Sequence, residues 1–142
     1  MIYPMFFMIL LTLGYGGYMA YGRFQAAKSG EINVRYFKTM SGYEVPDNVR
    51  LATRHFANLL ETPPLFYIAG ALIIAVGLES AFTIFIGWLY LACRIAHTYI
   101  HNTYNFPLHR MVAFIGSLVC ILLLWIVLLA VSYTHLTLPT KA

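Results

Sequence analysis

The chain has 142 residues, of which 61% are hydrophobic and only 10% are charged. Its mean hydropathy is +0.73, well above that of a soluble domain, so a water-soluble enzyme or binding module is excluded. The length suits one domain with about three to five membrane spans. The formal net charge is +4, but no basic, aromatic-rich soluble face accompanies it, so we expect no nucleic-acid partner.

Four continuous apolar segments follow one another, each near the roughly 20 residues that a helix needs to cross a bilayer. Because the apolar runs are continuous rather than alternating, they predict helices and not strands. The predicted spans cover about residues 3–21, 57–78, 81–100 and 107–131. The predicted fold is therefore all-α and integral to the membrane: a four-transmembrane-helix bundle over residues 1–131.

The two ends of the chain are interpreted differently. Residues 1–21 lack a basic leading region and an obvious cleavage site, so we expect a retained first helix rather than a signal peptide. Gly14, Gly16 and Gly17 in this segment favour close helix packing. The tail at residues 132–142 does not read as part of the fourth span, and an artefact of cloning or sequence assembly is one interpretation of it.

The basic residues lie at one end of the predicted bundle. The long polar connection and its borders carry Arg23, Lys28, Arg35, Lys38, Arg50 and Arg54, and Arg94 and Arg110 flank the connection at residues 101–106. Spans two and three are instead joined by little more than Glu79 and Ser80. The positive-inside rule therefore predicts that the basic end is cytoplasmic and that both termini lie on the opposite side.

Two groups of polar residues share helix faces within or beside these apolar segments. Arg54, Asn58 and Glu61 are spaced i, i+4, i+7, and Arg94, His97 and His101 are spaced i, i+3, i+7. Ionisable groups in membrane helices are energetically costly and face the protein interior or a wet cavity, so they indicate a functional site.

Alternatives to a functional site remain open for these groups. Arginines can snorkel to the headgroups, and Arg54 and Glu61 could neutralise each other or pair with Arg94 in a purely structural cluster. A haem between His55 and the later histidines is disfavoured, because His55 lies about 100° round its helix from Arg54. Cys93 and Cys120 show no metal-binding spacing, and we expect no metal.

Arg110 follows Pro107 at the predicted start of the fourth span, where proline is tolerated and Asn105 is expected to cap the helix. A helix N-terminus and an arginine both stabilise anions and lower the pKa of a nearby thiol. No cysteine of the chain is placed to be that thiol, so we expect a ligand to bring it. Glutathione fits, because it has two carboxylates for arginines, an ammonium for Glu61 and amides for Asn58.

The pattern R-x-x-x-N-x-x-E-x-x-P, formed by Arg54, Asn58, Glu61 and Pro64, resembles the second helix of the MAPEG family. These are the membrane-associated proteins of eicosanoid and glutathione metabolism. The later string of Arg94, Ala96, His97 and Thr98, followed by Arg110, is similar to the microsomal glutathione transferase and prostaglandin E synthase branch. Met111 stands where the synthases have a serine, so the synthase reaction itself is not implied.

The resemblance implies a homotrimer that binds glutathione as co-substrate between neighbouring protomers near the cytoplasmic face. Carried over by position, Arg110 is the catalytic residue that stabilises the thiolate, and the glutathione-binding residues are Arg54, Asn58, Glu61, Arg94, His97, His101 and Arg35. Arg23 competes with Arg35 for the place of a first-helix arginine.

The function that the resemblance implies is a glutathione-dependent transferase or peroxidase. Its second substrate is expected to be a lipophilic small molecule that arrives from the surrounding membrane lipids. The alternative is a non-catalytic membrane scaffold or lipid-binding protein with the same fold. The two differ at Arg110, because a scaffold has no need of a cation that stabilises a thiolate.

The charge distribution predicts that cysteines introduced at Ser41 and at Ser80 react with a membrane-impermeant thiol reagent from opposite sides of the bilayer. The background for both is a variant in which Cys93 and Cys120 are replaced by alanine. The measurement is labelling in sealed vesicles of known orientation. Labelling of both positions from the same side would contradict the four-span topology.

Overall fold

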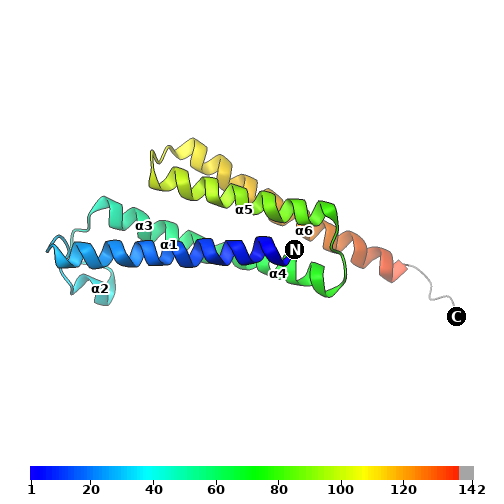
Figure 1. Ribbon diagram of the computed structural model, residues 1–142, viewed down its shortest axis with the longest axis horizontal. Helices are drawn as coiled ribbons and strands as arrows, with labels where there is room; N and C mark the ends of the chain where they lie inside the picture. The colour runs from blue at the N-terminus through cyan, green and yellow to red at the C-terminus, as the bar shows by residue number, and fades with distance from the viewer. Residues whose placement is uncertain (138–142) are drawn as a thin grey trace. The chain divides into compact units, whose positions relative to one another are not determined.

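The computed structural model describes the backbone of residues 1–137 and the side chains of residues 1–131 (Figure 1). It consists of α1 (Ile2–Lys28), α2 (Tyr36–Thr39), α3 (Asp47–Glu61), α4 (Pro63–Ala75), α5 (Ala81–Asn102) and α6 (Pro107–Thr137). The described part of the chain contains no strand. Within it, four stretches are long and apolar enough to cross a membrane: Ile2–Lys28, Asp47–Ala75, Ala81–Asn102 and Pro107–Val131. The predictions of an all-α fold and of four helical stretches long and apolar enough to span a membrane are thereby confirmed for the described residues.

The first helix is longer than the predicted span at residues 3–21. α1 continues to Lys28, because good helix formers such as Gln25 and Ala26 follow the apolar run. Hydropathy marks where a chain leaves the hydrocarbon, whereas a helix ends where its backbone hydrogen bonds end. Arg23 and Lys28 therefore lie on α1 and not in the polar connection where they were expected.

The second predicted span, residues 57–78, consists of two helices and begins earlier. α3 starts at Asp47, and the Arg50 amide donates to the Pro46 carbonyl at 3.0 Å. α3 and α4 are separated at Thr62, because Pro63 and Pro64 have no N–H to continue the hydrogen-bond ladder.

The later helix ends follow local backbone chemistry. α4 stops before the expected Leu78, at a turn in which Gly77 has a left-handed conformation with φ +70°. α5 begins after Ser80, whose side chain accepts a hydrogen bond from the Thr83 amide while the Thr83 hydroxyl accepts from the Ser80 amide. α6 begins at Pro107 as predicted and continues past Val131 to Thr137; the rest of the predicted tail lies outside the described residues.

The chain divides into two compact units, and each is described by itself. The α4–α6 unit contains Met1–Met8 and the chain from Thr62 onward, and the α1–α3 unit contains Ile9–Glu61. Within the α4–α6 unit, α5 and α6 lie side by side (Figure 1). A Cβ atom on Gly87 of α5 would lie only 3.2 Å from Pro4 Cγ, so this glycine allows the start of α1 to approach closely.

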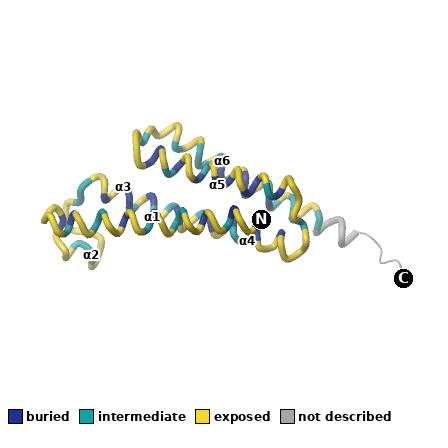
Figure 2. Tube along the Cα trace, in the orientation of Figure 1, coloured by how far each residue is buried: buried dark blue, intermediate teal, exposed yellow. Residues whose placement is uncertain are grey.

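α5 buries one side and exposes the other (Figure 2). Its buried side includes Tyr90, Arg94, His97 and His101, which recur at helical spacing. Its exposed side is apolar and carries Phe82, Phe85, Trp88, Leu89, Ile95 and Tyr99. Polar groups inside and apolar groups outside are what a hydrocarbon solvent favours.

The α1–α3 unit is held by contacts between α1 and α3. The Tyr15 and His55 rings meet edge to face with centroids 4.6 Å apart, and His55 is fully buried. Gly16 leaves room for the Phe56 ring, since a Cβ there would lie 2.9 Å from Phe56 Cε2. A smaller core anchors the connection that carries α2, and it comprises Ala26, Ile32 and Val49 with Tyr36, Phe37 and Val45 packed against it.

Candidate functional site

Four of the predicted site residues gather where α5 meets the start of α6, and we call this group the α5–α6 cluster: Arg94, His97, His101 and Arg110. His97 Nδ1 lies 3.0 Å from the Arg110 carbonyl oxygen. The His97 and His101 ring centroids are 6.1 Å apart. Arg94, His97 and His101 are buried, and Arg110 is half-buried. The cluster therefore gathers cationic and imidazole groups at one end of two candidate spans.

The contact between His97 and Arg110 fixes how the imidazole is protonated. A carbonyl oxygen accepts hydrogen bonds and cannot donate them, so His97 Nδ1 carries the proton of this bond. In the neutral ring, Nε2 then holds the lone pair. The His97 ring is thus oriented by the backbone at the start of α6.

Arg94 is fully buried and lies between two aromatic rings. Its guanidinium carbon is 5.6 Å from the centroid of the Tyr90 ring and 5.2 Å from that of Phe114, and its Nε donates to the Tyr90 hydroxyl at 3.3 Å. Tyr90 in turn stacks on Phe66 of α4, with centroids 4.1 Å apart. A desolvated cation–π contact is worth about 2 kcal/mol. Arg94 therefore ties α4, α5 and α6 together, and its role as a glutathione ligand stays a prediction.

Arg110 lies in the first turn of α6, where unpaired backbone N–H groups favour anions. Its Nη1 donates to the side-chain oxygen of Asn105 at 2.9 Å. Asn105 was expected to cap α6, but it has a left-handed backbone with φ +46° and bonds the guanidinium instead. Asparagine is favoured both as a helix cap and in a left-handed turn. The sequence alone therefore did not distinguish these two roles of Asn105.

The predicted stripe of Arg54, Asn58 and Glu61 lies on α3, in the α1–α3 unit. Arg54 and Glu61 are exposed in the single chain, and Asn58 is half-buried. All three fall in a stretch that is apolar enough overall to cross a membrane. Exposed charges on a membrane span require cover by protein or access to water, so this face is suited to a polar ligand or to a neighbouring chain.

Arg23 and Arg35, the two candidates for the first-helix arginine of the family, lie in different parts of the α1–α3 unit. Arg35 is exposed at the residue before α2. Arg23 is half-buried, and its Nη2 donates to Thr53 Oγ1 at 3.0 Å, beside Arg54 on α3. Sequence reasoning put Arg23 in the connection, and only the continued helix propensity of residues 22–28 could have indicated its position. The roles of both arginines in glutathione binding stay predictions.

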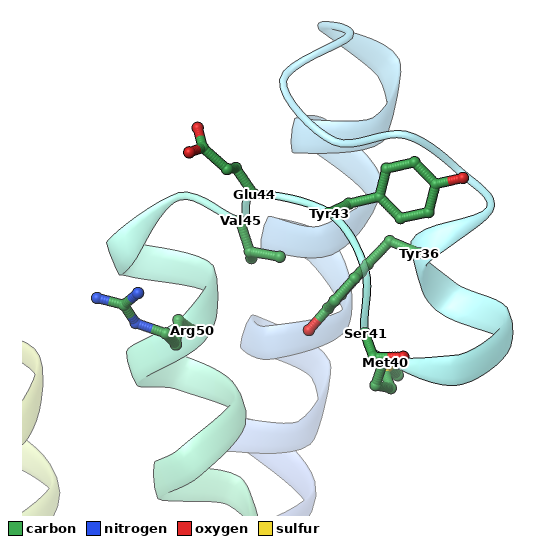
Figure 3. Close-up of a pocket in the computed structure, with 7 residues that line it drawn as sticks. All are labelled: Tyr36, Met40, Ser41, Tyr43, Glu44, Val45 and Arg50. Atoms are coloured by element: carbon green, nitrogen blue, oxygen red, sulfur yellow. The ribbon is translucent and has the colours of Figure 1, made fainter.

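The connection between α1 and α3 carries a hollow of about 390 Å³, lined by Tyr36, Met40, Ser41, Tyr43, Glu44, Val45 and Arg50 (Figure 3). Its polar side chains do not converge. Glu44 and Arg50 extend to one side of the connecting backbone, whereas Tyr43 extends to the other (Figure 3), and Arg50 pairs with Asp47. None of the predicted site residues lines this hollow, so we do not regard it as the candidate site.

Comparisons with known proteins identify one family. The family model described as the MAPEG family matches residues 1–130, which takes in the first three candidate spans and nearly all of the fourth. Searches of the curated proteins and of the solved structures give no match.

The aromatic surroundings of Arg94 predict different effects for two substitutions. Arg94→Lys should lower the free energy of unfolding by about 3 kcal/mol, because it leaves a compact buried ammonium without a planar face to stack. Arg94→Met should cost about 1 kcal/mol, since it fills similar space without a charge. Thermal unfolding in mild detergent measures both, with Ile95→Met on the exposed side of α5 as control. A lysine variant as stable as the parent chain would contradict the aromatic role.

Proposed function

Because the chain belongs to the MAPEG family, as its motifs predicted, we propose that it is a glutathione-dependent membrane transferase or peroxidase acting on lipophilic electrophiles. The observation that carries the proposal is Arg110, a half-buried arginine at the start of α6 that contacts His97 and Asn105. Family membership favours glutathione or eicosanoid metabolism, and the α5–α6 cluster has the charge that the glutathione sulfur needs.

The chemistry requires a thiolate. A free thiol with a pKa of about 8.5 is mostly protonated at neutral pH, and lowering that pKa by about two units requires roughly 2.7 kcal/mol of differential stabilisation. A guanidinium and a helix N-terminus can together supply it in a site shielded from water. The thiol of glutathione loses its proton as the thiolate forms beside Arg110. The thiolate sulfur then bonds to the electrophile, whose leaving group or opened ring takes up a proton.

The α3 stripe is proposed to hold the rest of glutathione. At neutral pH the tripeptide carries two carboxylates and one ammonium. Arg54 matches a carboxylate by paired hydrogen bonds, Glu61 matches the ammonium, and Asn58 matches the peptide amides. The site is proposed to lie at the cytoplasmic side, where the basic residues concentrate.

The exposure of Arg54 and Glu61 in the single chain supports the proposal of a homotrimer with shared sites. In lipid these charges need cover, and a neighbouring protomer would provide it. We propose that the α3 stripe of one protomer and the α5–α6 cluster of its neighbour form one site.

A second candidate function, non-catalytic lipid binding, is favoured by a different feature. The α4–α6 unit has an apolar groove of about 320 Å³, lined by Leu72, Val76, Leu78, Trp125, Leu128, Leu129 and Val131. Its lining suits an acyl chain. This groove requires nothing of Arg110, so substitutions at Arg110 separate the two functions.

Replacing Arg110 by alanine should leave glutathione binding largely intact but raise the pKa of the bound thiol. If the lost stabilisation is about 2 to 3 kcal/mol, turnover should fall by roughly 30- to 150-fold. Arg110→Lys should reduce turnover less than Arg110→Ala does. An ammonium keeps the positive charge but loses the paired, planar donors of the guanidinium. The measurement is a pH titration of thiolate absorbance with bound glutathione.

Arg54→Ala and Glu61→Gln serve as the matched comparison. They should weaken glutathione binding for every electrophile and leave the titration of the remaining bound thiol unchanged. Identical titration curves for the parent chain and Arg110→Ala would remove Arg110 from the chemistry. A parent chain that binds no glutathione would shift the protein to the lipid-binding or scaffold function.

Shared sites predict that two impaired variants restore each other's activity in part. When Glu61→Gln and Arg110→Ala chains assemble together at random in equal amounts, about a quarter of the shared sites have both intact halves. We therefore expect, at limiting glutathione, activity near a quarter of the parent level from co-expressed chains. Chains mixed after purification should show only the low activity of the single variants. Native mass spectrometry should show trimers in both samples. Mixed trimers without recovered activity would contradict sites shared in this way.

A further inference from the structure

Asn105 has an unusual backbone in the short connection between α5 and α6. Its φ is +46°, a left-handed conformation that asparagine tolerates better than most other residues with a side chain. Its amide donates to the Ile100 carbonyl at 2.8 Å and so satisfies one of the last carbonyls of α5. The backbone of Asn105 is therefore part of how α5 ends.

The side chain of Asn105 makes a second, separate contact. Its Oδ1 accepts a hydrogen bond from Arg110 Nη1 at 2.9 Å, and both residues are half-buried. The Arg110 carbonyl meanwhile contacts His97 Nδ1 on α5 at 3.0 Å. Arg110 is thus held at both ends, its backbone by His97 and its guanidinium by Asn105.

We infer that Asn105 is a positioning residue that aims the Arg110 guanidinium at the sulfur of bound glutathione. The inference rests on the proposed function and adds a residue that none of the motifs contains. Donors fixed before the reaction stabilise a developing anion best, because they need no reorganisation. An unrestrained arginine carries about 2 kcal/mol of rotamer entropy, so an acceptor that selects one rotamer favours the productive orientation.

The chemistry of the amide explains why asparagine suits this position. An amide oxygen is neutral, so it orients the guanidinium without cancelling its charge. Aspartate would orient it equally well but would neutralise it, and glycine would keep the left-handed backbone but lose the acceptor. Alanine would lose both the acceptor and the tolerance of positive φ.

Three variants separate these properties. Asn105→Gly should keep thermal stability and glutathione binding, while the pKa of the bound thiol rises and turnover falls by about 10-fold, as for other residues that orient a functional group. Asn105→Asp should raise the thiol pKa further than glycine does. Asn105→Ala should also lower the unfolding temperature. Asn102→Ala, at the end of α5, is the control and should leave the titration unchanged.

The readouts are the thiolate titration with bound glutathione and the unfolding temperature in detergent. In a double variant, Asn105→Gly should add no further loss to Arg110→Ala, because it acts only through that guanidinium. Additive losses would overturn the inference, and so would an Asn105→Gly titration that matches the parent chain; either leaves the proposed function standing. A parent chain that fails to bind glutathione would overturn both.

Discussion

A fully buried guanidinium is the constraint on which the α4–α6 unit depends. Arg94 sits inside a helix long and apolar enough to cross a membrane, where an unstabilised charge would be very costly. Its charge is accommodated by the faces of Tyr90 and Phe114 and by the Tyr90 hydroxyl. Because Tyr90 also stacks on Phe66, one cation sets the mutual register of three helices.

That register also determines the geometry of the candidate site. Phe114 follows Arg110 by one helical turn on α6, and Arg94 precedes His97 by one turn on α5. Once Phe114 covers Arg94, the Arg110 carbonyl comes to lie beside His97. The protonation of His97 and the position of Arg110 are thus consequences of burying a different arginine.

Sequence reasoning recovered what periodicity and composition encode, and it missed what depends on contacts between helices. The shared, buried helix face of His97 and His101 and the helix start at Pro107 were predicted correctly. Hydropathy did not show that α1 continues to Lys28 or that the second span breaks at Thr62, although the two prolines were visible. Tyr90 and Phe114 were not singled out, because aromatic residues in an apolar run look alike until the register between helices is known.

The two arginines of the α5–α6 cluster show how surroundings assign roles to identical side chains. Aromatic faces stabilise the charge of Arg94 in the interior of the α4–α6 unit. Arg110 is half-buried, and the contact seen at its guanidinium is a neutral amide oxygen, which orients the cation and leaves its charge undiminished. A thiolate needs a cation that is both fixed and uncompensated. Arg110 meets both conditions, and its place in the first turn of α6 adds the favourable end of the helix dipole.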